Sequence, residues 1–144
     1  MGDINIELIN AAWMGDLETV KVMLEMGGKI DSLNENGITP LIASVYQGHK
    51  DVVEYLLSCG PNLEQSEPKN GATPLMFAVL NGRDDLVDIL IQNGAMLNST
   101  DNMLWNAIFY AVKGNQFGCA RQLIEKGIDV DTRDDLGTTA FMYA

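Results

Sequence analysis

The sequence predicts an all-α solenoid built from repeated pairs of short helices, and three sets of marker residues lead to this prediction. The first is a five-residue segment with the pattern Gly-x-Thr-Pro-Leu or a weaker form of it, at residues 37–41, 71–75, 104–108 and 137–141. The second is a turn residue: Gly15, Gly48, Gly82 and Asn115. The third is a helix-ending glycine: Gly27, Gly60, Gly94 and Gly127. Each set recurs every 33 or 34 positions, and a fixed period of this length indicates stacked structural repeats.

The first helix of each unit is indicated by a residue that can cap its start. Thr39 and Thr73 each precede a proline, and a capping hydroxyl followed by a proline pre-set for the first turn is typical of helix starts. Asn106 takes this place in the fourth unit and can also cap, whereas the first unit offers only Asn5 nearby. The turn residue that follows is Gly, or Asn115 in the fourth unit, because these residues adopt positive φ most easily.

The second helix of each unit is indicated by apolar residues at helical spacing. They are Val20, Met23 and Leu24; Val53, Leu56 and Leu57; Val87, Leu90 and Ile91; and Ala120, Leu123 and Ile124. After the glycine that ends this helix, about ten polar, turn-forming residues lead to the next unit, as in residues 31–36 and 129–135.

A helix, a tight turn, a second helix and an extended loop in every unit resemble the ankyrin repeat, with its Gly-x-Thr-Pro-Leu start, Gly-His turn and Gly-Ala-x-Val-Asn exit. Gly48-His49 and residues 94–98 stand close to that pattern. The resemblance implies L-shaped units in which the loop projects as a β-hairpin finger and each unit buries its apolar face against its neighbours. We therefore predict one domain over residues 1–144, with repeats at 1–36, 37–70, 71–103 and 104–136 and a partial repeat at 137–144.

Several positions depart from the ankyrin pattern. The fourth unit has Leu104 in place of the finger glycine and Ala107 in place of the proline, so we expect a distorted finger there. The loop at residues 64–70 holds one extra residue and should form a longer fingertip. The histidine that usually follows Thr-Pro-Leu is absent, and packing by Ile42, Met76 and Phe109 is expected to replace its hydrogen bonds. The last unit stops inside its first helix, which favours a longer array over a short chain with a half-repeat end.

The composition excludes several classes of function. A formal net charge of −11 repels phosphate backbones, so we expect no nucleic-acid partner, although the simplest role of the acidic residues is solubility. No apolar run is long enough to span a membrane, and the first residues resemble neither a secretory signal nor a transit peptide. Two cysteines, Cys59 and Cys119, lie too far apart in the array to be bridged. We expect a monomer inside the cell, in the cytoplasm.

No catalytic motif stands out, and we expect neither an enzyme nor a bound cofactor or metal. His49 lies in a turn between helices and is interpreted as structural, and Cys119 as a small buried apolar residue. The acid pair 84–85 opens a helix, where carboxylates suit the positive end of the dipole. The pair 134–135 lies in a finger and is interpreted as solvated.

Ankyrin proteins usually bind partners along the fingers and the exposed face of the first helices. Carried over by register, that surface includes Asn10 and, in the first finger, Asn34, Glu35, Asn36 and Ile38. The residues that we predict to contact a partner are Trp13, Met14, Tyr46, Gln47, Phe77, Leu80, Asn81, Trp105, Tyr110 and Lys113. Exposed aromatic side chains on a rigid scaffold dominate binding hot spots.

These residues predict a non-catalytic module that binds a protein or peptide, with hydrophobic anchors and basic flanks, in an aromatic groove with an acidic border. The alternative for the aromatic side chains is that they pack as outlying core, and Trp105 in particular can fold back over the irregular fourth finger. Two other functions stay open. The array can be the regulatory region of a larger enzyme or signalling protein, or a sensor of a nucleotide-like ligand, for which Lys113 is the only concave base.

Overall fold

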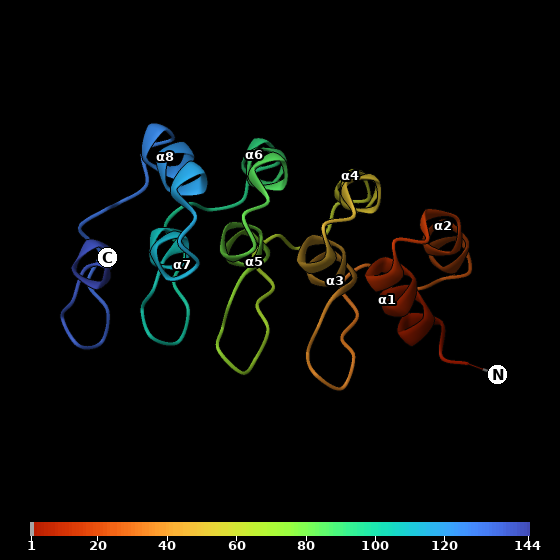
Figure 1. Ribbon diagram of the computed structural model, residues 1–144. Helices are drawn as coiled ribbons and strands as arrows, with labels where there is room; N and C mark the ends of the chain where they lie inside the picture. The colour runs from red at the N-terminus through yellow and green to blue at the C-terminus, as the bar shows by residue number, and fades with distance from the viewer. Residues whose placement is uncertain (1) are drawn as a thin grey trace.

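The computed structural model describes residues 2–144, which form eight α-helices and a final turn of 3₁₀-helix (Figure 1). In chain order they are α1 (Ile4–Met14), α2 (Leu17–Glu25), α3 (Pro40–Gln47), α4 (Lys50–Ser58), α5 (Pro74–Leu80), α6 (Asp84–Gln92), α7 (Ala107–Lys113), α8 (Phe117–Glu125) and η1 (Ala140–Tyr143). Figure 1 shows α1, α3, α5 and α7 in one row, their antiparallel partners in a second row, and four hairpin loops projecting beyond the first row. The predicted all-α solenoid is confirmed.

The capping and turn residues behave as predicted in three of the units. Thr39, Thr73 and Asn106 each accept a hydrogen bond from a backbone N–H in the first turn of the helix that follows. A residue with positive φ follows the first helix of each unit. It is glycine in three units, and in the fourth Asn115 takes this place with a φ of 57°. The period in the sequence therefore reports a repeated backbone conformation.

The prediction of a cap at Asn5 is wrong. The carboxylate of Asp3 caps α1 and accepts hydrogen bonds from the N–H groups of Asn5 and Ile6. Asn5 lies in the first turn of α1, where its side-chain oxygen accepts a hydrogen bond from the N–H of Lys29 at 2.8 Å. A side chain inside the helix can thus hold the loop that follows α2.

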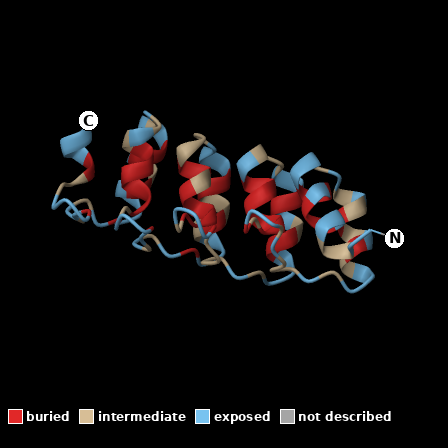
Figure 2. Ribbon diagram, turned by 90° about the horizontal axis from the view of Figure 1, so that it is seen from below, coloured by how far each residue is buried: buried red, intermediate tan, exposed pale blue. Residues whose placement is uncertain are grey.

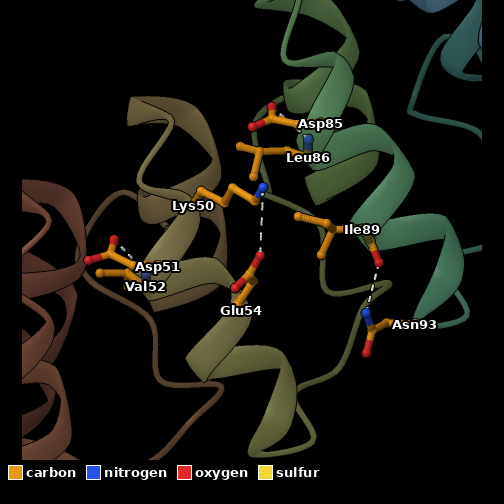
Figure 3. A network of polar contacts seen from close by, with 8 residues as sticks. All are labelled: Lys50, Asp51, Val52, Glu54, Asp85, Leu86, Ile89 and Asn93. Atoms are coloured by element: carbon orange, nitrogen blue, oxygen red, sulfur yellow. Dashed lines mark hydrogen bonds and ion pairs between the residues drawn. The ribbon is translucent and has the colours of Figure 1, made fainter.

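Two helices of the second row, α4 and α6, start in a different way from the helices of the first row. Neither His49 nor Arg83 caps its helix with a side chain. Instead Asp51 and Asp85, which are equivalent in α4 and α6, accept the N–H of the next residue at 2.8 and 2.9 Å (Figure 3). Asp85 thus belongs to the positively polarised helix start, as predicted for this acid pair.

Two further polar contacts of these helices are local and exposed (Figure 3). Lys50 and Glu54 form an ion pair at 4.0 Å with about half of each side chain exposed, and such pairs stabilise a fold by less than about 1 kcal/mol. The side-chain amide of Asn93 donates to the carbonyl of Ile89 at 2.8 Å. Both contacts lie within a single helix or at its end and do not join the two helices.

Side chains from one repeat cover the turn of the repeat before it. The Nε2 atom of His49 lies 2.9 Å from the carbonyl oxygen of Trp13, and Gln116 donates in the same way to the carbonyl of Leu80 at 3.2 Å. His49 also lies directly over Gly15, where a Cβ atom would come within 2.5 Å of the imidazole ring. Gly15 is thus required both for its positive φ and for this close approach. The structural interpretation of His49 is confirmed.

Each finger is organised by one polar side chain that accepts hydrogen bonds from backbone N–H groups inside the loop. These residues are Asn34, Glu67, Asp101 and Asp134, and they recur every 33 or 34 positions. The second finger is closed by a hydrogen bond from the N–H of Glu67 to the carbonyl of Ala72, and the first by one from Asn34 to Ile38. The second loop is therefore one residue longer. The longer second finger is as predicted.

The prediction of a distorted finger in the fourth unit is wrong. Leu104 adopts a φ of 65°, close to the 75° of Gly71 at the equivalent place. Asp101 accepts the N–H groups of Met103 and Trp105 at 2.8 and 3.0 Å, as Asn34 does in the first finger. These bonds hold the finger geometry although leucine in this conformation costs about 1–2 kcal/mol.

The buried apolar residues form one continuous layer along the array, and Figure 2 shows buried residues in the successive helix pairs. The residues that replace the usual histidine, Ile42, Met76 and Phe109, are at most 2% exposed. Packing therefore fills these positions, as predicted. Because each helix pair contributes to the layer shared with the next pair, the first helices are held in a regular row beside the fingers.

Candidate binding cleft

A cleft of about 440 Å³ lies between the first finger and the helices α1, α3 and α5. Its lining combines three isoleucines, three asparagines and three aromatic residues: Ile9, Ile38, Ile42, Asn10, Asn34, Asn36, Trp13, Tyr46 and Phe77. No charged side chain lines it, although the chain carries a net charge of −11. A concave, mostly apolar surface with a few polar groups is the usual form of a binding site.

Three aromatic rings form a continuous platform along one side of the cleft. The rings of Trp13 and Tyr46 stack with centroids 5.5 Å apart and planes 15° from parallel. Phe77 meets Tyr46 edge-on at 5.9 Å. Trp13 and Tyr46 are each 41% exposed, which leaves a large apolar area in contact with water. Stacking fixes the two rings, so they lose little further freedom when a partner covers them.

The first finger supplies the opposite wall. The side-chain oxygen of Asn34 accepts the N–H groups of Asn36 and Ile38 at 2.9 and 3.0 Å, so the amide nitrogen of Asn34 keeps its donor capacity. Ile9 and Ile42, which are nearly fully buried, form the floor. Sequence reasoning missed these two isoleucines as part of the site, because their register marks them as core.

Acidic side chains lie beside the cleft rather than in it. Two further hollows share Asn10 with the cleft; one contains Glu35, and the other contains Glu7 and Asp16. Hydrogen bonds from the hydroxyl and the N–H of Thr19 lower the pKa of Asp16 below its usual value, so it is ionised at neutral pH. Within residues 2–144 none of these three acids forms an ion pair. The edge of the cleft is therefore formed by the amide side chain of Asn10, and the acidic side chains lie beyond it.

Four of the other predicted contact residues lie outside this cleft. Met14 is 74% exposed and lines the neighbouring hollow with Glu7. Gln47, Leu80 and Asn81 are half-buried on the same row of helices and do not line the cleft. Their role in binding stays a prediction.

The expected exposure of Tyr110 is wrong. Its ring is only 6% exposed, and its hydroxyl donates a hydrogen bond to the carboxylate of Asp101. Burial, followed by this bond, raises the pKa of Tyr110 above its ordinary value, so the hydroxyl stays protonated. The ring is drawn inward because a buried carboxylate requires donors.

Trp105 packs as outlying core, one alternative that the sequence left open, but it reaches the next finger at Asp134 instead of folding back over its own. Its ring stacks on Phe109 with centroids 5.4 Å apart, and its Nε1–H donates to Asp134 at 3.2 Å. The ammonium of Lys113 lies 5.5 Å from the centre of the indole. Tyr143 completes this second aromatic cluster through contacts with Trp105 and Phe109.

The acids and cysteines that were considered for chemistry have structural surroundings. We expected Asp134 to be solvated, and this expectation is wrong, because the residue is only 5% exposed. Both cysteines are free thiols, Cys59 exposed and Cys119 buried. Burial, together with a hydrogen bond to Asp84 at 2.8 Å, raises the pKa of Cys119 to about 12, which keeps this thiol protonated and unreactive.

Comparison with known proteins identifies the repeat. Residues 8–101 match the family model described as ankyrin repeats in three copies. The chain belongs to the ankyrin-repeat family. Ankyrin repeats generally mediate protein–protein interaction.

Three relatives show the range of proteins that contain similar segments. The ankyrin repeat and KH domain-containing protein mask-1 of Caenorhabditis elegans is 27% identical over 141 residues, which cover 97% of this chain and 5% of that protein. Protein fem-1 homolog CG6966 of Drosophila melanogaster is 41% identical over 70 residues, or 44% of this chain and 10% of the relative. Protein phosphatase 1 regulatory subunit 27 of Mus musculus is 38% identical over 53 residues, or 37% of this chain and 34% of the relative. The chain thus spans about a third or less of the length of these ankyrin relatives.

The described part of the chain lacks two other features. No group of histidine, cysteine and acidic residues within 2–144 is placed to hold a metal ion. In the same part of the chain, no helix has the length and apolar character that crossing a membrane requires.

Proposed function

We propose that this ankyrin array is a non-catalytic binding module that holds an apolar segment of a partner protein in the cleft between the first finger and α1, α3 and α5. The observation that carries the proposal is the stacked and exposed pair Trp13–Tyr46 beside an uncharged hollow of about 440 Å³. Tryptophan and tyrosine side chains in such positions supply most of the affinity of protein interfaces. The family and the regulatory-subunit relative support a role without catalysis.

The flanks of the cleft favour a partner segment that carries lysine or arginine next to its apolar anchor. Glu7, Asp16 and Glu35 lie beside the cleft without basic partners among residues 2–144. Exposed charges of this kind contribute mainly to the association rate and to the choice of partner. The anchor then binds in the uncharged centre, and the basic groups meet the acids on either side of Asn10.

The experiment is a selection of random displayed peptides on the wild-type chain, followed by direct binding measurements on the double variant Trp13→Ala, Tyr46→Ala. Selected peptides should combine an apolar or aromatic anchor with an adjacent lysine or arginine. Loss of a hot-spot pair should weaken their binding by about 30-fold, which corresponds to about 2 kcal/mol.

The matched control is Phe117→Ala, because Phe117 is 69% exposed at the start of α8 and does not line the cleft. This variant should bind the selected peptides as the wild-type chain does. Equal binding by a folded double variant, with its helical circular dichroism intact, would show that the cleft is not the binding site.

A second function is favoured by the lengths of the relatives. The matched segments are parts of longer proteins, one of which is named as a regulatory subunit. We therefore keep the proposal that this array serves as the regulatory, partner-holding region of a larger enzyme or signalling protein. Sensing of a nucleotide-like ligand has less support, because Lys113 lies over Trp105 and does not line the cleft.

A further inference from the structure

Neighbouring fingers are joined by backbone hydrogen bonds at two of their three junctions. The N–H of Asn102 in the third finger donates to the carbonyl of Asn70 in the second finger at 2.9 Å. The N–H of Asp135 in the fourth finger donates to the carbonyl of Met103 in the third finger at 3.2 Å. In both junctions the donor directly follows the carboxylate residue that organises its finger. The second, third and fourth fingers are thus linked tip to tip.

Pro68 occupies the donor position at the remaining junction. It directly follows Glu67, the residue that organises the second finger, and its ring lies against Gly37 so closely that an added Cβ would overlap it. Asn102 lies against Gly71 in the same way, with its backbone nitrogen 3.1 Å from the place of a Cβ. The two contacts show that Pro68 and Asn102 are structurally equivalent.

A proline has no backbone N–H and cannot make this bond. Accordingly, within the part of the chain that the structure describes, no hydrogen bond joins residues 34–38 of the first finger to residues 67–72 of the second. Among the described residues the hydrogen bond between these two loops is at their base, where Asp31 accepts the N–H of Asn62 at 2.9 Å. On its other side, the tip of the first finger faces the open cleft.

We infer that the first finger moves as a unit, independently of the linked second, third and fourth fingers, because Pro68 interrupts the chain of bonds between fingertips. The bonds of Asn34 to its own loop keep the finger folded while it moves. Since Asn34, Asn36 and Ile38 line the cleft, this movement changes the width of the cleft. The motion is independent of the proposed function, whereas its use in adjusting the cleft to a partner rests on that proposal.

The test is amide hydrogen exchange of the free wild-type chain, followed by NMR and expressed as protection factors. The N–H groups of Asn36, Gly37 and Ile38 have the same loop bonds as those of Met103, Leu104 and Trp105 in the third finger. The first set should nevertheless be less protected by about fivefold, the factor that one hydrogen bond of about 1 kcal/mol represents.

Two reciprocal variants connect this difference to the proline. Pro68→Asn restores a donor opposite the Asn36 carbonyl and should raise the protection of the first finger about fivefold. Asn102→Pro removes the bond to Asn70 and should lower the protection of Asn70, Gly71 and Ala72 by a similar factor. Protection of the helices, which neither variant touches, serves as the internal control for folding.

Equal protection of the first and third fingers in the wild-type chain would overturn the inference, with no need of a variant. An unchanged first finger in folded Pro68→Asn would also overturn it. Because these measurements use the free protein, a failure to select any peptide on the cleft would leave their outcome unaffected.

Discussion

The two aromatic clusters of this ankyrin array have similar residues but opposite surroundings. Trp13, Tyr46 and Phe77 form an exposed platform along the cleft near the first finger. The second cluster, around Trp105, packs between the last two fingers and η1 with its polar atoms bonded: its members are Trp105, Phe109, Tyr110 and Tyr143. Among residues 2–144, the indole N–H of Trp13 and the hydroxyl of Tyr46 have no hydrogen-bond partner. The open cluster is therefore available for a partner, whereas the other is part of the fold.

The residues that organise the last two fingers account for the hydrogen bonds of the second cluster. Asn34 uses its only side-chain oxygen for its own loop, and its amide nitrogen cannot accept a hydrogen bond. Asp101 and Asp134 use one oxygen in the same way, which leaves a second oxygen for aromatic donors. These second oxygens bind the hydroxyls of Tyr110 and Tyr143, each nine residues further along the chain. In the last two fingers an aspartate thus binds a tyrosine hydroxyl of the helix that follows, whereas the residue nine positions after Asn34 is Ala43 and no such bond can form.

The largest expected difference between the clusters is in stability. Phe109→Ala should lower the free energy of unfolding by about 3–5 kcal/mol, because Phe109 is 2% exposed and its removal leaves a cavity. Phe77→Ala, at a half-buried ring beside the cleft, should cost less and instead weaken peptide binding. Chemical denaturation followed by circular dichroism measures both. A larger loss for Phe77→Ala than for Phe109→Ala would reverse the assignment of the two clusters.

The hydroxyl groups give a smaller and more specific comparison. Tyr110→Phe removes a donor from the buried carboxylate of Asp101 and should lower the free energy of unfolding by about 1–2 kcal/mol. Tyr46→Phe removes a hydroxyl without a partner among the described residues and should change stability by less than about 0.5 kcal/mol. The same denaturation experiment compares them. Equal losses would contradict the role given to the second carboxylate oxygen.

The sequence predicted the parts of this fold that local conformation decides. The period, the caps at Thr39 and Thr73 and the positive φ of Asn115 follow from preferences of single residues, and all are present. The burial of Tyr110 could not be predicted from its own position, because it depends on the contact with Asp101. The geometry at Leu104 was missed for a related reason: glycine preference is a local signal, and the bonds of Asp101 override it.

A signal for the aromatic contacts was nevertheless present in the sequence. Aspartate and tyrosine occur nine residues apart in the last two fingers, as Asp101 with Tyr110 and Asp134 with Tyr143. The first finger has Asn34 and Ala43 at the same interval. Only the structure shows that this interval brings the tip of the finger to the first turn of the next helix.

Acid should affect the cluster around Trp105 through Asp134. The hydroxyl of Tyr143 and other donors lower the pKa of Asp134 to about 2 from an ordinary value of 3.8. Because the folded-state pKa is depressed, the carboxylate stabilises the fold fully above about pH 4, and this contribution is lost as the pH falls from 3.8 through about 2. Trp105 fluorescence in a Trp13→Phe variant should follow this range. In Asp134→Asn, which cannot ionise, the transition should disappear; if it persists, another group is responsible.

The smallest expected effect compares the fingers themselves. Leu104 adopts a φ of 65° with 49% of its surface exposed, whereas the first finger has Gly37 at the equivalent place. Leu104→Gly should raise the free energy of unfolding by about 0.5–1 kcal/mol, because relief of about 1–2 kcal/mol of backbone strain exceeds the lost packing of a half-exposed side chain. The reverse change, Gly37→Ala, should be destabilising, since the new Cβ would overlap Pro68. If Leu104→Gly instead lowers stability, the leucine contributes packing that outweighs its strain, and the finger is held by its side chain as well as by Asp101.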